Sequence, residues 1–134
     1  MSPKSCPCTS GKSYKSCCEP YHKGELPTKA VELMRSRFSA YAMGNHAYII
    51  KTTDPTSPVY RKNVAKWRKW LKEYTATTTF LKLHILNLPA ERFGEADLTV
   101  TAVLLLHVKD ISFTERSLFR KEKGRWLYVR PLNL

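Results

Sequence analysis

Acidic residues and long apolar runs are both scarce in this sequence of 134 residues. Eleven Asp and Glu stand against 23 Lys and Arg, so the formal net charge is +12. The longest apolar run, residues 102–106, is far shorter than the ~20 residues that a membrane-spanning helix needs. The first residues, MSPKSCPC, lack the apolar segment of a secretory signal. We therefore expect a cytoplasmic protein without a membrane span, in a compartment that keeps thiols reduced.

The sequence also lacks the patterns of common active sites. It contains no glycine-rich phosphate loop, no Ser/His/Asp pattern and no paired-carboxylate motif. All four cysteines lie within the first 18 residues, so none remains elsewhere to act as a nucleophile. We interpret His84 and His107 as packing or surface residues. These absences favour a binding protein over an enzyme.

What the sequence does have is a cluster of four cysteines, Cys6, Cys8, Cys17 and Cys18, in an otherwise polar segment. So short and polar a segment cannot offset its chain entropy unless something cross-links it. Four thiolates suit a closed, tetrahedral, structural zinc site, and iron is the alternative metal. Disulfides are disfavoured by the reducing compartment, and a bridge between the adjacent Cys17 and Cys18 would be strained.

Lysines surround this predicted zinc knuckle. They give it a positive fringe suited to an acidic protein surface or to phosphates; the residues are Lys4, Lys12, Lys15 and Lys23. Residues 24–27 read as a linker. The sequence therefore predicts two parts, a knuckle over residues 1–24 and a larger domain over residues 28–134.

Two helices are predicted at the start of the larger domain. The first begins after Thr28 as N-cap, shows apolar residues at spacings of three and four, and ends at Gly44. Residues 46–51 add one or two further turns. The second begins at Ser57-Pro58 and carries an apolar stripe, made of Tyr60, Val64, Trp67, Leu71 and Tyr74.

Most of the remaining surface of the second helix is basic, with Arg61, Lys62, Lys66, Arg68, Lys69 and Lys72. Such a face suits RNA backbone contact. We favour a solvated face, because no platform of base-stacking aromatic residues accompanies it. A second basic region surrounds the last hairpin, and polyanion binding gains support only if the two regions meet on one surface.

After Tyr74 the apolar period changes to two, which predicts an antiparallel sheet. Strands are expected over residues 77–87, 98–108 and 111–119, with a turn at Lys123-Gly124 before a last strand at 126–130. Helices followed by strands give an α+β fold.

Glu115 alternates with Phe113 and Ser117 on a predicted strand face. A carboxylate that faces a core needs a partner, and Arg35 or Arg37 is the expected one. The pair either ties the first helix to the sheet or forms the floor of a ligand pocket. We favour the structural tie, because no neighbouring acid/base partner is identifiable.

The segment CPCTSGKSYKSCC closely resembles the SEC-C motif, which is also found at the C-terminus of the SecA translocase motor. The rest resembles the YchJ-like family, through residues 33–38, Tyr48-Ile49, Lys51-Thr52, residues 115–117, Phe119, Gly124, Trp126 and Tyr128. In that family a SEC-C motif precedes a domain similar to nuclear transport factor two, in which helices pack on a curved sheet to form a cone.

The chain departs from the family pattern in four places. Thr9 stands where the motif usually has Gly, Leu118 where the family tends to have Arg, and Asp54-Pro55 where it has His-Pro. The sequence reaches Leu134 without the second SEC-C motif that many relatives carry. We therefore do not expect a function that needs two knuckles.

The resemblance implies a zinc-binding module for contact with a protein or the ribosome. In SecA the similar motif contacts the chaperone SecB. The leading hypothesis is a non-enzymatic adapter, in which replacing Cys17 and Cys18 abolishes partner capture but leaves the larger domain folded. The alternatives are a small-molecule carrier or enzyme that uses the cone interior, and an RNA-binding protein.

Overall fold

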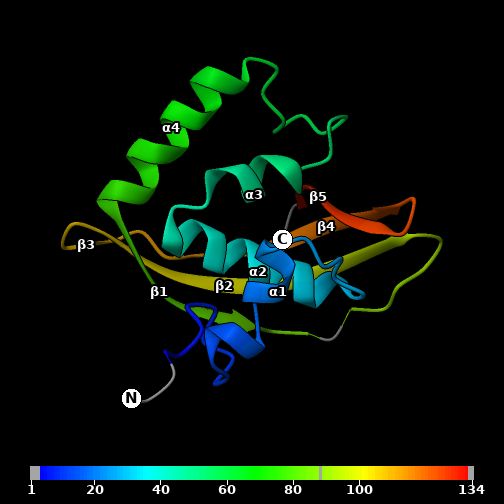
Figure 1. The fold of residues 1–134 in the computed structure, drawn as a ribbon, viewed down its shortest axis with the longest axis horizontal. Coiled ribbons are helices and arrows are strands. Elements are labelled where there is room, and N and C mark those ends of the chain that lie inside the picture. The colour runs from blue at the N-terminus through cyan, green and yellow to red at the C-terminus, as the bar shows by residue number, and fades with distance from the viewer. Residues whose placement is uncertain (1–3, 88, 133–134) are drawn as a thin grey trace.

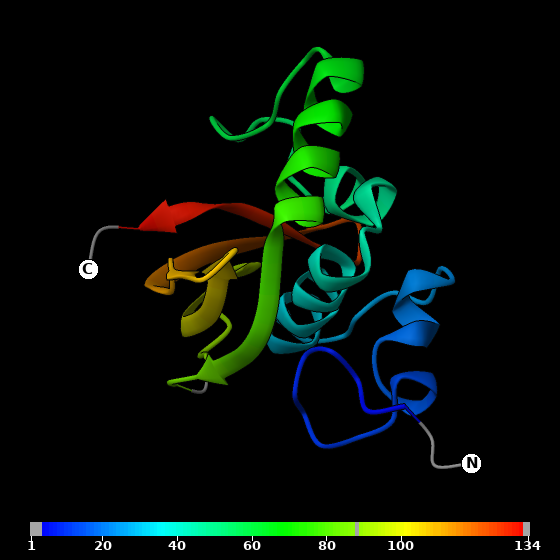
Figure 2. The same cartoon turned by 90° about the vertical axis from the view of Figure 1, so that its left-hand side faces the viewer.

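The computed structural model describes residues 4–87 and 89–132 and has the predicted α+β architecture (Figures 1 and 2). A 3-10 turn, Tyr14–Ser16, and α1, Glu19–His22, follow the first cysteines. The longer helices are α2, Ala30–Met43, α3, His46–Lys51, and α4, Val64–Thr77. The strands are β1, Thr78–Ile85, β2, Glu95–Leu106, β3, Lys109–Asp110, β4, Phe113–Glu122, and β5, Arg125–Leu132.

The strands form one curved antiparallel sheet in the order β1-β2-β4-β5, with the short β3 paired to β2. Helices α2, α3 and α4 lie on one face of this sheet, which Figure 2 shows from its side. On β2, alternate residues from Ala96 to Leu104 are buried beneath the helices. This alternation is the period of two from which the strand was predicted.

The strand ends were predicted less well than the strands themselves. Val108 was expected on the buried face of β2, but it is 97% exposed and lies beyond the strand. The strand stops because His107 adopts a left-handed conformation, with φ 56°, in the turn into β3. The turn at Lys123-Gly124 was predicted correctly, and both residues have positive φ, as a two-residue hairpin turn requires.

Helix α2 begins one residue later than predicted. Its N-cap is Lys29 rather than Thr28. The Thr28 hydroxyl donates instead to Glu32, and its carbonyl accepts from the Trp126 indole, so the segment before the helix is fastened to β5. The predicted end is correct, because Gly44 closes the helix in the left-handed conformation.

The predicted start of the second long helix is wrong. Helix α4 begins at Val64, with Asn63 as its side-chain N-cap. Ser57 does not cap it, because the Ser57 hydroxyl donates to the Val129 carbonyl and holds the preceding loop on β5. Tyr60 therefore packs on Trp67 from outside the helix, with ring centroids 5.1 Å apart. The sequence signal at Ser57 marks a turn that a tertiary contact keeps out of the helix.

The N-terminal segment packs against α2 and the edge strand β1, below the sheet in Figure 1. Cys6, Cys8 and Cys18 belong to the same buried cluster as core residues of α2 and the sheet, such as Leu33 and Leu98. The segment therefore shares one hydrophobic core with the larger domain.

Candidate metal centre

Backbone geometry brings the two cysteine pairs together. Cys6 N–H donates to the Lys12 carbonyl at 2.8 Å, and Tyr14 N–H donates to the Lys4 carbonyl at 2.9 Å. Between them Thr9 and Gly11 have φ of 59° and 89°, the left-handed conformations that reverse the chain. The 3-10 turn then presents Cys17 and Cys18 to the first pair.

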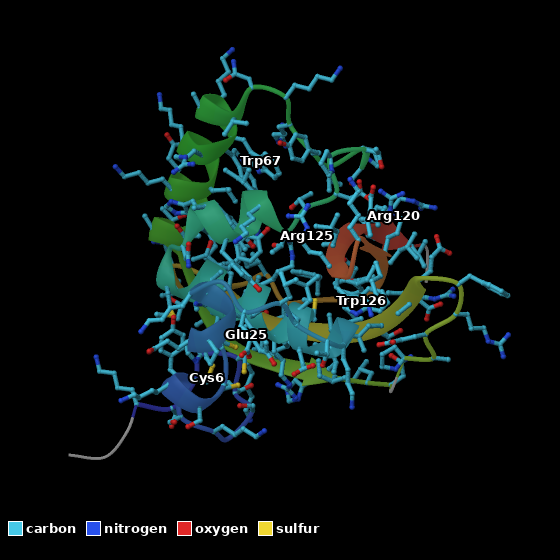
Figure 3. All side chains as sticks on the ribbon, turned by 45° about the vertical axis from the view of Figure 1, so that its right-hand side comes forward. Cys6, Glu25, Trp67, Arg120, Arg125 and Trp126 are labelled. Carbon is cyan, nitrogen blue, oxygen red and sulfur yellow. The ribbon has the colours of Figure 1, made fainter. Side chains whose placement is uncertain are left out.

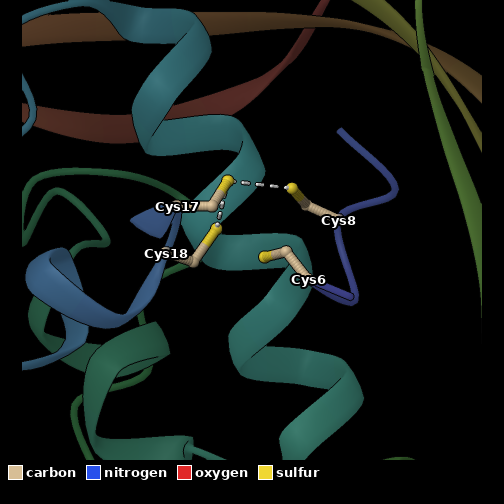
Figure 4. Close-up of side chains that lie close together, drawn as sticks. All are labelled: Cys6, Cys8, Cys17 and Cys18. Carbon is tan, nitrogen blue, oxygen red and sulfur yellow. Dashed lines mark hydrogen bonds between the residues drawn. The ribbon is translucent and has the colours of Figure 1, made fainter. Parts of the chain in front are cut away.

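The four sulfur atoms converge on one point (Figure 4) and all lie within 4.8 Å of one another. Cys8 Sγ is 3.6 Å from Cys17 Sγ, which is 3.9 Å from Cys18 Sγ. A tetrahedral ion with metal–sulfur bonds of about 2.3 Å places its sulfurs about 3.8 Å apart. The cluster therefore fits a tetrahedral tetrathiolate metal ion, as predicted from the spacing. Three of its four cysteines are buried.

Each sulfur also has a polar neighbour from outside the cysteine set. Ser39 on α2 lies 3.3 Å from both Cys6 Sγ and Cys18 Sγ, and Ser10 Oγ lies 3.2 Å from Cys17 Sγ. Arg35, one turn before Ser39, donates to the Cys8 carbonyl at 3.2 Å and lies 4.0 Å from its sulfur. Such donors orient thiolates and offset their negative charge.

The sulfurs hold protons unequally. Hydrogen bonding with Cys18 lowers the pKa of Cys8 to about 4, although burial acts in the opposite direction. The same contact, followed by burial, raises the pKa of Cys18. Burial also raises the pKa of Cys17. Metal binding therefore has to release protons from Cys17 and Cys18, because only thiolates coordinate.

Thr9 explains one departure from the SEC-C pattern. A β-branched residue at φ 59° is strained, which is why glycine suits this position. The Thr9 hydroxyl donates to the Leu83 carbonyl at 3.3 Å and accepts from the Leu83 N–H at 3.2 Å. The side chain thus pairs with the free edge of β1 and fastens the knuckle to the sheet.

One of the four lysines predicted to surround the knuckle is already in an ion pair. Lys4, Lys12 and Lys15 are exposed, whereas Lys23 forms an ion pair with Glu19 at 2.9 Å. Between the knuckle and α2 lies a cavity of about 300 Å³, lined in part by Lys12, Cys17, Glu32 and Arg35. The less buried edge of the cysteine cluster therefore faces a polar groove with cations on it.

Sequence reasoning missed His22, which ties the knuckle to α2. Its Nδ1 is 2.7 Å from the Tyr14 hydroxyl, and its Nε2 is 2.8 Å from the Ser36 carbonyl. Burial lowers the pKa of His22. Because the contact that joins the knuckle to α2 is made with Ser36, 14 residues further along the chain, this role had no local signal.

The expected ion pair between Glu115 and an arginine is not formed among the described residues. Arg35 contacts the knuckle, and Arg37 Nη1 donates to Ile49, Thr52 and Thr53 oxygens beneath α3. These bonds hold Arg37 Nη1 at the end of α3 rather than on the Glu115 carboxylate. Glu115 accepts from Ser117 and Tyr128 instead, at 2.7 Å each. Arg37 and Glu115 do line one cavity, between the helices and the sheet.

The two predicted basic regions lie on different elements, one on α4 and the segment before it, the other on the last hairpin. Arg68, Lys69 and Lys72 are exposed on α4, as is Lys66. In Figure 3, Arg120 and Arg125 mark the last hairpin and Trp67 marks α4. Arg61 and Lys62 precede the helix. Polyanion binding by a surface that combines the two regions therefore stays a prediction. No helix within residues 4–87 and 89–132 meets the length and hydropathy needed to cross a bilayer.

Known proteins similar to this chain share both parts of it. A family model described as the YchJ middle, NTF2-like domain matches residues 29–131. A UPF0225 protein of Haemophilus influenzae strain 86-028NP is 33% identical over 132 residues, which cover 98% of this chain and 79% of that protein. A UPF0225 protein of Actinobacillus succinogenes is 33% identical over 126 residues, covering 92% and 79%.

Two solved structures have the same fold. The solution structure of a SEC-C motif containing protein from Rhodopseudomonas palustris has a TM-score of 0.80 at 30% identity, over 96% of this chain and 98% of that one. The crystal structure of a SEC-C motif containing protein from Psychrobacter arcticus has a TM-score of 0.75 at 24% identity, over 96% and 84%. The chain therefore belongs to the YchJ-like, UPF0225 family, with a SEC-C cysteine motif ahead of an NTF2-like domain.

Proposed function

We propose that this protein is a non-enzymatic adapter whose zinc knuckle docks on an acidic surface of a partner protein, free or on the ribosome. One observation supports it most: the cysteine cluster packs into the core beside α2, while Lys12 and Lys15 of the knuckle are exposed to solvent. A closed tetrathiolate shell leaves no coordination position for a substrate, so the metal would act by shaping this surface.

Zinc is the metal of this proposal, because four thiolates in a tetrahedral set suit it and it has no redox chemistry to disturb a structural role. The thiolates also require a reducing setting, which the cytoplasm provides. Elemental analysis of the reduced, purified protein should find one zinc per chain. A stoichiometric amount of iron in place of zinc would contradict this assignment.

Charge reversal tests the docking surface better than removal of a cysteine. Cys18 is a buried member of the core that the knuckle shares with the larger domain. Replacing Cys17 and Cys18 is therefore expected to destabilise the larger domain as well, contrary to the expectation from the sequence. Lys12 and Lys15 are exposed, so Lys12→Glu with Lys15→Glu removes the positive surface without removing core contacts.

The matched control is Lys66→Glu with Lys69→Glu on α4, which makes the same change in charge on another part of the molecule. Zinc-loaded baits would be incubated with bacterial lysate and with purified ribosomes. We expect a specific partner to be captured by the wild type and the α4 variant and lost by the knuckle variant, because complementary charge steers docking. Equal capture by both variants would refute the proposal.

A further inference from the structure

A second feature, separate from the knuckle, is a cavity of about 270 Å³ between α2, α4 and the inner face of the sheet. Its lining runs from Met34 to Tyr128 and includes no knuckle residue. Trp70 and Phe113 belong to the lining and are 48% and 44% exposed. Solvent therefore reaches the cavity beside these two rings.

The walls are aromatic and hold one another in place. Tyr41 stacks on Phe80 with ring centroids 5.9 Å apart, and Trp70 stacks on Tyr74 at 5.1 Å. Tyr74 also meets Tyr41 and Phe80 edge to face, at 6.0 and 5.8 Å. Ala102, a small residue, lines the cavity from β2. An interlocked wall of this kind favours a preformed site for a flat apolar molecule.

One acceptor in this apolar lining remains available. Glu115 Oε2 accepts from the Ser117 and Tyr128 hydroxyls, which fixes the carboxylate in one orientation. Burial, then the Glu115 charge, raises the pKa of Tyr128, so its hydroxyl keeps the proton that it donates. Glu115 Oε1 takes part in no hydrogen bond with another residue among those the structure describes. It is therefore a fixed acceptor without a protein donor.

Arg37 and Glu115 together limit the charge that a ligand of this cavity can carry. It lines the same cavity, and its guanidinium carbon lies 4.6 Å from the centre of the Tyr128 ring. The cavity thus contains one positive and one negative side chain, both in contact with Tyr128. A cationic ligand would meet Arg37 and an anionic ligand would meet Glu115, so the lining favours a neutral molecule.

We propose that this cavity binds a small, flat, neutral molecule that carries one hydrogen-bond donor, with the donor on Glu115 Oε1. A dry cavity of about 150 Å³ holds benzene, so one of about 270 Å³ holds about ten non-hydrogen atoms. A fused bicyclic ring with one N–H or O–H group meets both conditions. This site does not depend on the docking function of the knuckle.

Two bicyclic probes of nearly equal shape test the inference. Indole has an N–H donor, whereas benzothiophene has a sulfur atom in its place. Binding would be followed by NMR titration of the zinc-loaded wild-type chain, with the Trp70 indole signal as reporter. We expect indole to bind about tenfold more tightly, because hydrogen bonds to charged groups exceed neutral ones in strength.

The informative variant is Glu115→Gln, because its amide oxygen can keep the two bonds from Ser117 and Tyr128 while its N–H₂ group replaces the free oxygen. We expect the variant to bind both probes equally. Ala102→Leu, which fills the cavity, should abolish both. Equal affinities in the wild type would overturn the role of Glu115, and no saturable binding of either probe would overturn the site itself.

Discussion

Replacing Ser39 with alanine removes a buried hydroxyl group that lies beside two of the four sulfurs. Ser39 is completely buried, and its Oγ lies 3.3 Å from both Cys6 Sγ and Cys18 Sγ. Loss of such outer partners usually costs about 10- to 100-fold in metal affinity. At about 1.4 kcal/mol for each factor of ten, this corresponds to roughly 1.4 to 2.8 kcal/mol. We expect the Ser39→Ala protein to bind zinc more weakly by this amount.

The same helix supplies a matched control. Ser36 is equally buried, but its hydroxyl contacts the Leu33 carbonyl and the Tyr48 hydroxyl rather than a sulfur. Ser36→Ala should reduce the free energy of unfolding by about 1 kcal/mol, as for an ordinary hydrogen bond, and leave zinc affinity unchanged.

Competition with a chromophoric chelator measures the zinc affinity of each variant, and urea unfolding measures its stability. If Ser36→Ala and Ser39→Ala weaken zinc binding equally, the effect comes from general loosening of α2, and the proposed interaction with the thiolates is wrong. An unchanged affinity in Ser39→Ala would refute it as well.

Three further changes test other contacts by urea unfolding. Thr9→Val should cost about 1 kcal/mol, because it leaves the Leu83 backbone without its hydroxyl partner, whereas Thr9→Ser should cost less. Burial raises the pKa of Asp54, but hydrogen bonds from Thr56 and the charge of Arg120 outweigh it and hold this pKa below its ordinary 3.8. The stability that Asp54 contributes is therefore complete well above the ordinary pKa of 3.8 and is lost as the pH falls through it towards the folded-state pKa, a loss that Asp54→Asn should reduce. Asn63→Ala should destabilise α4 by about 1 kcal/mol and lower helical circular dichroism, and no change would place the helix start elsewhere.

The periodic parts of the fold could be predicted, because burial on one face leaves a repeating pattern in the sequence. The alternation of β2 is of this kind, whereas the end of α2 was predicted from Gly44 itself, because glycine readily adopts the left-handed conformation. The start of α4 could not be predicted in this way. Ser57 and Asn63 both have capping side chains, and a contact with Val129, distant in the sequence, decides between them.

The same distinction holds at the candidate metal centre. The cysteine spacing predicts the sulfur cluster, since short loops bring the two pairs together. Arg35 and Ser39 are four residues apart and so share one helix face, but nothing local shows that the knuckle covers this face. Arg37 was expected to pair with Glu115, but its Nη1 donates to three oxygens beneath α3 instead. The partners of Arg35, Arg37 and Ser39 are thus determined by tertiary packing, which the local sequence does not show.

The bond between Thr9 and Leu83 has a consequence for biosynthesis. The knuckle leaves the ribosome early, but its edge contact requires a strand made more than 70 residues later. Its packing also requires α2, which supplies the serine beside the sulfurs. On a nascent chain the knuckle therefore lacks both its edge contact and the Ser39 hydroxyl beside its sulfurs until β1 and α2 have emerged.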